Sequence, residues 1–274
     1  MSGRRDGEPV LLIQGLGADS RGWIFQQGSL GRRHRVIVFD NRGVGRSDKP
    51  PGPYDLEVMT DDALAVLDAA ACESAHVVGA SMGGVIAQIL AVRHPERVRS
   101  LVLACTACQN PPWRRELLLE WRAMARAQGM RAFGQANMRW LVGSRSLRRF
   151  WPAMGLLAPL VIAAPVHGFV AQIDAILSAD EGLREEAGTV DVPALVMVGS
   201  QDILTPLADS EELVDLRPHD TELAVIRGAA HGFMIENAGA FNRAVLDFLD
   251  RVITDRSHLE LDFSQVQSTA AAAG

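Results

Sequence analysis

The chain has 274 residues, enough for one large α/β domain or two modest ones with a substantial core. Its formal net charge is −6 and it carries no long basic run, which disfavours nucleic-acid binding. No apolar run reaches the length of a membrane span, and the first six residues lack the apolar core of a signal peptide. We therefore expect a cytoplasmic protein that binds neither nucleic acid nor membrane.

Two apolar runs near the start, residues 9–14 and 35–40, predict strands covered on both faces, and a glycine-rich loop follows each. A dinucleotide-binding loop needs a third glycine, where this chain has Ser20 and Asp48, and neither loop opens into an obvious helix. A nicotinamide or flavin enzyme is therefore disfavoured, and we expect no cofactor.

Helices and strands then alternate, which is typical of a doubly wound, mostly parallel sheet. The predicted helices cover residues 60–71, 82–93, 207–216 and 238–253, and the predicted strands cover residues 75–78, 98–104, 192–199 and 222–226.

This alternation stops between residues 109 and 188, where the pattern is helical and no convincing strand occurs. The stretch predicts a cap of short helices, divided by prolines, over the strand ends. Of its four tryptophans (Trp151 is the fourth), we expect Trp113, Trp121 and Trp140 to line an apolar substrate pocket, although they would hold the cap to the body in any case. Nine arginines between Arg114 and Arg149 indicate either a solvated helix face or attraction of anionic substrates.

The predicted organisation is thus a core of residues 1–108 and 189–256, a helical cap of residues 109–188, and a tail of residues 257–274 that we expect to be disordered. Cys105 and Cys108 have redox spacing, but isolated cysteines are usually buried. A zinc site would need two further ligands nearby and none appear, so we expect no metal.

A candidate nucleophile lies where the predicted strand at residues 75–78 turns into the next helix. Ser81 stands within Gly79-Ala80-Ser81-Met82-Gly83, a Gly-x-Ser-x-Gly pattern. Glycine is required on both sides because strand and helix approach closely. The helix start directs free N–H groups toward this point, which suits a developing oxyanion.

A serine hydroxyl needs a base within hydrogen-bond reach and a third group to orient that base. Of seven histidines, His231 is the one in a Gly/Ala-rich loop just past a strand, whereas His34, His76, His94 and His219 are predicted to be surface residues. Asp202 follows the preceding strand in the same way, so its carboxylate should emerge at the same sheet edge. Serine, aspartate and histidine then occur in the order of an α/β-hydrolase triad.

These motifs, with the loops at residues 40–48 and 228–231, resemble the α/β-hydrolase family over residues 10–253, and residues 47–54 are similar to bacterial 3-oxoadipate enol-lactonases and related esterases. The resemblance implies an oxyanion hole formed by the N–H groups of Leu16 and Met82. Gln14 departs from the histidine usual at its position, so the hydrogen bonds within that loop should differ. The strand pair that normally opens the family's sheet is absent, which predicts about six strands, an edge at residues 36–39 and a possible homodimer.

The sequence therefore predicts a serine hydrolase of a small-molecule carboxylic ester or lactone. Hydrolysis of a carbon–carbon bond and cofactor-free perhydrolysis use the same triad and stay open. A non-catalytic ligand-binding member of the fold and a redox protein using Cys105 and Cys108 are the alternatives from other classes.

Overall fold

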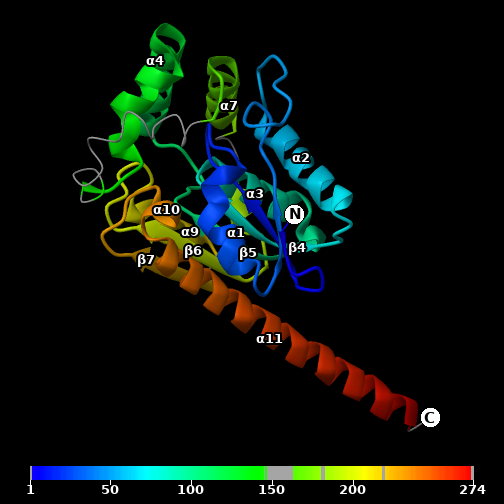
Figure 1. The fold of residues 1–274 in the computed structure, drawn as a ribbon. Helices are drawn as coiled ribbons and strands as arrows, with labels where there is room; N and C mark the ends of the chain where they lie inside the picture. The colour runs from blue at the N-terminus through cyan, green and yellow to red at the C-terminus, as the bar shows by residue number, and fades with distance from the viewer. Residues whose placement is uncertain (1, 145, 147–162, 180–182, 218–219, 273–274) are drawn as a thin grey trace.

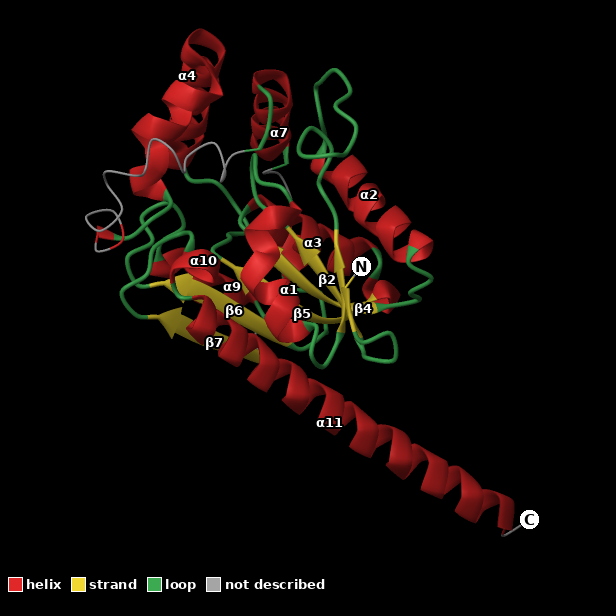
Figure 2. Cartoon of the chain, viewed as in Figure 1, coloured by secondary structure: helices red, strands yellow, loops and turns green. Residues whose placement is uncertain are grey.

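The core is a seven-stranded, mostly parallel sheet with helices on both faces (Figures 1 and 2). Its strand order is β1-β3-β2-β4-β5-β6-β7. The computed structural model describes residues 2–144, 146, 163–179, 183–217 and 220–272, with the backbone alone from residue 256. The strands are β1 (Ser2–Gly3), β2 (Pro9–Ile13), β3 (Arg35–Val38), β4 (Ala75–Ala80), β5 (Val98–Ala104), β6 (Ala194–Gly199) and β7 (Thr221–Ile226). The α-helices are α1 (Ile24–Leu30), α2 (Leu56–Ala69), α3 (Met82–Arg93), α4 (Pro112–Asn137), α7 (Val166–Ser178), α8 (Leu183–Ala187), α9 (Leu207–Leu216), α10 (Phe233–Glu236) and α11 (Ala238–Ala272).

The continuous apolar runs form strands because both faces of the sheet are covered. In β2, Leu11 and Ile13 pack into the cluster shared with α2, α3 and α9, while Val10 and Leu12 face α1, α10 and α11. All four side chains are fully buried. Each such side chain stabilises the fold by about 1.5–3 kcal/mol relative to an exposed one. This double burial confirms the predicted doubly wound architecture.

The prediction of six parallel strands omitted β1, and the prediction that β3 forms an open edge was wrong. Ser2 pairs with Val36 and Gly3 with Arg35 in an antiparallel bridge. Gly3 has a φ of +88°, and a Cβ there would lie 2.4 Å from His34 O, so this close approach requires glycine. A two-residue strand without apolar side chains leaves no pattern in a sequence. The homodimer, which was argued from the open edge, stays an untested prediction.

The predicted cap region forms helices α4, α7 and α8 in its described parts, and those parts contain no strand. Helices α4 and α7 stand together beyond the carboxyl ends of the strands (Figure 1). Pro165 is the N-cap residue of α7, in agreement with its predicted role as a helix boundary. Trp151, Pro152 and Pro159 of the cap lie outside the described residues.

The last helix, α11, begins at Ala238 as predicted and runs to Ala272, whereas we expected it to end near residue 253 and a disordered tail to follow. The alanine, glutamine and leucine residues of this segment are good helix formers, which suits its helical backbone. No helix among the described residues is long and apolar enough to cross a membrane.

Two histidines predicted at the surface are buried instead: His34 is 3% exposed and His76 is 1% exposed. His76 lies in β4, and its Nδ1 is 2.8 Å from Ser100 Oγ on the neighbouring strand β5. Burial lowers the pKa of His34, so the neutral ring is favoured inside the protein.

Candidate active site

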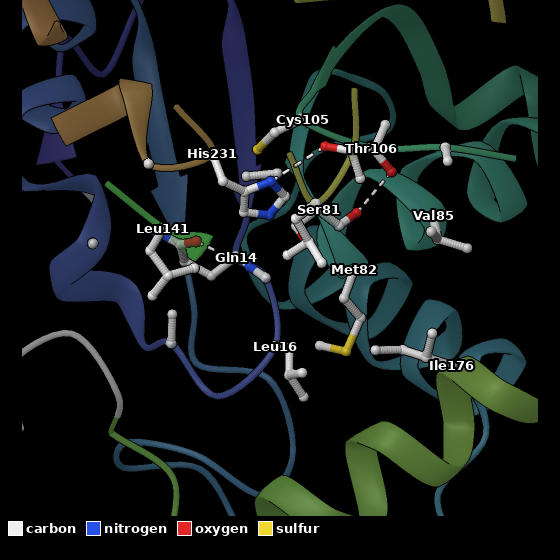
Figure 3. A pocket seen from close by; sticks show the side chains of 18 of the residues that line it. Gln14, Leu16, Ser81, Met82, Val85, Cys105, Thr106, Leu141, Ile176 and His231 are labelled. Atoms are coloured by element: carbon white, nitrogen blue, oxygen red, sulfur yellow. Dashed lines mark hydrogen bonds between the residues drawn. The ribbon is translucent and has the colours of Figure 1, made fainter. Parts of the chain in front are cut away.

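Four loops that follow strands meet at the carboxyl edge of the sheet. Parallel strands place their carboxyl ends at the same edge, so the segments after β2, β4, β6 and β7 gather there. These segments carry Leu16, Ser81, Asp202 and His231 respectively. Leu16, Ser81 and His231 line one cavity of about 540 Å³ (Figure 3).

Ser81 adopts a strained backbone conformation at the turn between β4 and α3, with φ 54° and ψ −120°. Such a conformation costs about 1–3 kcal/mol in a non-glycine residue. The surrounding turn holds it in place: Ser81 N donates to Ala104 O at 2.9 Å, and Thr106 Oγ1 donates to Ser81 O at 2.8 Å. A Cβ on Gly83 would lie 2.2 Å from Ile13 O, which agrees with the close approach predicted from the glycine pattern.

Asp202 and His231 form a buried hydrogen-bonded pair. His231 Nδ1 lies 2.8 Å from Asp202 Oδ2, and the two side chains are 7% and 0% exposed. Asp202 Oδ1 accepts from the N–H groups of Leu204 and Thr205 at 2.9 and 3.0 Å. Burial raises the pKa of the Asp202 carboxyl, but the imidazole and these donors outweigh it, so the pKa lies below its usual value. The carboxylate therefore stays ionised and directs His231 Nε2 away from itself.

Thr205 lies within hydrogen-bond distance of both members of this pair, and this contact was not predicted from the sequence. Its Oγ1 donates to Asp202 Oδ2 at 2.9 Å and lies 3.2 Å from His231 Nδ1. The sequence does contain one indication of this contact, because Thr205 lies three residues after Asp202. At that spacing a side chain and a backbone N–H can both bond back to the carboxylate.

The backbone N–H groups of Leu16 and Met82 are the two predicted donors of an oxyanion hole. The hydrogen bonds of this region are made by neighbouring N–H groups. The N–H groups of Gly15 and Gly17 donate to Gln14 Oε1 and Gln172 Oε1 at 2.9 and 2.8 Å. Among the described residues, no such acceptor bonds the N–H of Leu16, nor that of Met82 at the start of α3. Gln14 thus bonds within its own loop through its side-chain amide oxygen.

The loop that carries Gly15 and Leu16 also lies directly against the turn at Ser81. A Cβ on Gly15 would lie 3.1 Å from Ser81 Cβ, so the loop and the serine side chain are in contact distance. Gln172, which reaches this loop from α7, is fully buried, and its amide group also donates to Arg42 O at 2.9 Å. A cap helix therefore fixes the loop, a contact that no local sequence pattern reveals.

The cavity wall is mostly apolar and includes side chains from the cap. Trp121, Phe133 and Phe169 contribute aromatic surface, and Trp121 packs edge-on against Phe133 with centroids 5.5 Å apart. Of the other predicted tryptophans, Trp140 packs edge-on against Trp121 and Trp113 is 42% exposed. Neither is among the described wall residues, so Trp121 is the tryptophan that contacts the cavity.

Two arginines of the cavity wall are each paired with a carboxylate. Arg21 Nε lies 2.8 Å from Asp19 Oδ2. Arg114 is 4% exposed, bonds the Asp209 carboxylate, and donates from Nε to Leu204 O at 2.8 Å. The prediction of a solvated face therefore fails for Arg114, because its charge is neutralised by a partner on a helix distant in the sequence.

The two cysteines with redox spacing are buried and unsuited to thiolate chemistry. Burial raises the pKa of the Cys105 thiol well above its usual value, and the nearby Asp202 charge adds to this. Burial likewise raises the pKa of Cys108 to about 12. Reactive thiols require a lowered pKa. Within the described parts of the chain, no group of three or more His, Cys, Asp or Glu side chains is arranged to bind a metal.

Comparison with known proteins identifies the family to which the chain belongs. Residues 8–138 match the family model described as the alpha/beta hydrolase fold. The chain belongs to the α/β-hydrolase family.

Individual relatives span nearly the whole chain. A putative carbamate hydrolase RutD from Caulobacter sp. strain K31 is 32% identical over 256 residues, covering 89% of this chain and 91% of the relative. The 3-oxoadipate enol-lactonase 2 of Acinetobacter baylyi is 30% identical over 255 residues, 89% of each chain. The crystal structure of the enol-lactonase from Burkholderia xenovorans LB400 superposes with a TM-score of 0.84 at 31% identity, covering 91% of this chain and 94% of that one.

Proposed function

We propose that this chain is a serine hydrolase that cleaves a carboxylic ester or lactone through an acyl-enzyme. The observation that carries the proposal is the buried 2.8 Å hydrogen bond between Asp202 and His231, at the wall of the cavity that Ser81 lines. This is the arrangement in which a carboxylate holds an imidazole ready to accept a proton from a serine hydroxyl. The family membership and the enol-lactonase relatives support the hydrolytic class.

In the proposed mechanism, Ser81 Oγ attacks the carbonyl carbon while His231 Nε2 accepts its proton. Asp202 stabilises the imidazolium that forms, and the N–H groups of Leu16 and Met82 stabilise the tetrahedral oxyanion. His231 then returns the proton to the leaving oxygen as the acyl-enzyme forms. Water repeats the sequence and releases the acid. One such oxyanion donor typically contributes about 3–4 kcal/mol to the barrier reduction.

The part of the proposed substrate that lies inside the cavity is uncharged. The described wall is dominated by apolar side chains, and both of its arginines, Arg21 and Arg114, are occupied by carboxylates. A substrate carboxylate placed there would compete with Asp19 and Asp209 for these guanidinium groups. This favours apolar esters over the anionic substrates that were one interpretation of the cap arginines.

Cleavage of a carbamate is the second candidate, because several relatives are named putative carbamate hydrolases. The carbonyl of a carbamate can accept the same attack by Ser81 and the same oxyanion hydrogen bonds. Assays that follow acid release from p-nitrophenyl acetate and amine release from a matched carbamate separate the two. The ester should be turned over faster.

The test of the hydrolase proposal is a Ser81→Ala variant assayed with a short p-nitrophenyl ester, together with covalent labelling by a fluorophosphonate. Wild type should be labelled and active, and the variant neither, with activity lower by at least about 10³-fold. Ser29→Ala, on α1, is the matched control and should behave as wild type. A wild type that is not labelled would instead support a non-catalytic ligand-binding protein. Cytoplasmic location remains a prediction from the sequence.

A further inference from the structure

A short segment of the cap is bonded to the loops that carry Asp202 and His231. Leu141 O accepts from Gly232 N at 2.6 Å, immediately after His231. Two residues further on, Gly143 N donates to Glu236 Oε1 at 2.9 Å. Ser144 N then donates to Gln201 Oε1 at 3.3 Å, directly before Asp202. We call residues 141–144 the cap strap.

Glu236 bonds both the cap strap and the histidine loop. While Oε1 accepts from Gly143, Oε2 accepts from Ala230 N at 3.0 Å, the residue that precedes His231. The backbone N–H of Glu236 also donates to Gly232 O at 3.1 Å. The residues on both sides of His231 are therefore bonded to Glu236.

Glu236 is the last residue of the four-residue helix α10, and its side chain reaches backbone N–H groups outside that helix. What the carboxylate gains is two N–H donors, and hydrogen bonds to an ionised acceptor are roughly twice as strong as neutral ones. The position is therefore explained by the contacts of the side chain with the strap and the loop.

From these contacts we infer that Glu236 is a positioning residue, which holds the His231 imidazole in register with Ser81 by bonding its loop to the cap strap. The inference rests on the proposed hydrolase function. Glu236 does not line the cavity among the described residues and so does not contact substrate. Its loss should therefore slow the chemical step and leave substrate binding nearly unchanged.

The test is Glu236→Gln, which keeps the shape but presents an amide N–H to one of the two N–H donors. Per site titrated with fluorophosphonate, kcat for a p-nitrophenyl ester should fall at least about tenfold while KM changes less than about twofold, because small misplacements of catalytic groups are costly. Glu211→Gln, on the exposed face of α9, makes the same chemical change away from the site and should leave both constants unchanged.

A kcat per titrated site within about twofold of wild type for Glu236→Gln would overturn the inference, since far larger losses follow misplacement of such groups. If that variant does not fold, Glu236→Asp replaces it, because the shorter side chain keeps the charge but cannot reach both N–H groups. The same fall in kcat at constant KM supports the inference, and its absence overturns it. A wild type that shows neither labelling nor turnover refutes the hydrolase proposal instead.

Discussion

Replacing Arg114 by Met should destabilise the protein strongly, because the guanidinium is buried and satisfies three acceptors. It bonds the Asp209 carboxylate, Leu204 O at 2.8 Å and Gln109 O at 3.1 Å. Removing one member of a buried ion pair costs about 3–5 kcal/mol, mostly from the charge left behind. Burial already raises the pKa of Asp209, and the guanidinium is the group that opposes this. For a chain of this size that loss lowers the melting temperature by about 6–10 °C.

Calorimetry or thermal melting followed by circular dichroism measures this shift. The double variant Arg114→Met/Asp209→Leu removes both charges and should recover most of the lost stability, which separates the orphaned charge from lost packing. A shift of 2 °C corresponds to about 1 kcal/mol of stability or less. If Arg114→Met alone melts within about 2 °C of wild type, the reasoning is refuted. A KM that rises for an anionic ester and stays constant for a neutral one would show instead that Arg114 recognises substrate charge.

Three further changes test other parts of the structure. Burial raises the pKa of Asp40, but two backbone N–H donors outweigh it and lower the pKa below its usual value. Its stabilisation is therefore present above about pH 4 and lost as the pH falls through the lowered pKa. Asp40→Asn should thus be less stable than wild type at pH 7 by about 1–2 kcal/mol in urea unfolding, with the difference shrinking in acid. Gly83→Ala should abolish ester hydrolysis and destabilise by about 1–3 kcal/mol, because its Cβ would lie 2.2 Å from Ile13 O; an active, stable variant contradicts the close approach. Cys108, with its pKa raised to about 12, should resist iodoacetamide at pH 8 in the folded protein and react after unfolding, as mass spectrometry would detect.

The parts of the fold that the sequence predicted are those set by local sterics and by burial on two sides. Strands β2 and β6 are short and apolar on both faces, which leaves a continuous run in the sequence. The turn at Ser81 needs glycine at fixed positions for the same steric reason wherever it occurs. The prediction that Asp202 and His231 meet followed from the geometry of parallel strands, which brings their carboxyl ends to one edge.

The parts that were missed depend on contacts between distant segments. Helix α1 has exposed Ile24 and Phe25 and an internal Gly28, so it lacks an amphipathic pattern. The burial of Arg114 depends on Asp209, and nothing near either residue indicates that they pair. Glu236 similarly looks like a surface residue until its two backbone donors are known.

The strained turn at Ser81 and the loop pair of Asp202 and His231 lie on strands separated by β5, which carries no member of the proposed triad. Hydrolysis would therefore require that widely spaced stretches of polypeptide have all docked correctly. Recovery of ester turnover after dilution from denaturant should lag behind recovery of helical circular dichroism, because non-local contacts form late. The rate of ester turnover would then measure the fraction of molecules that have reached the native state.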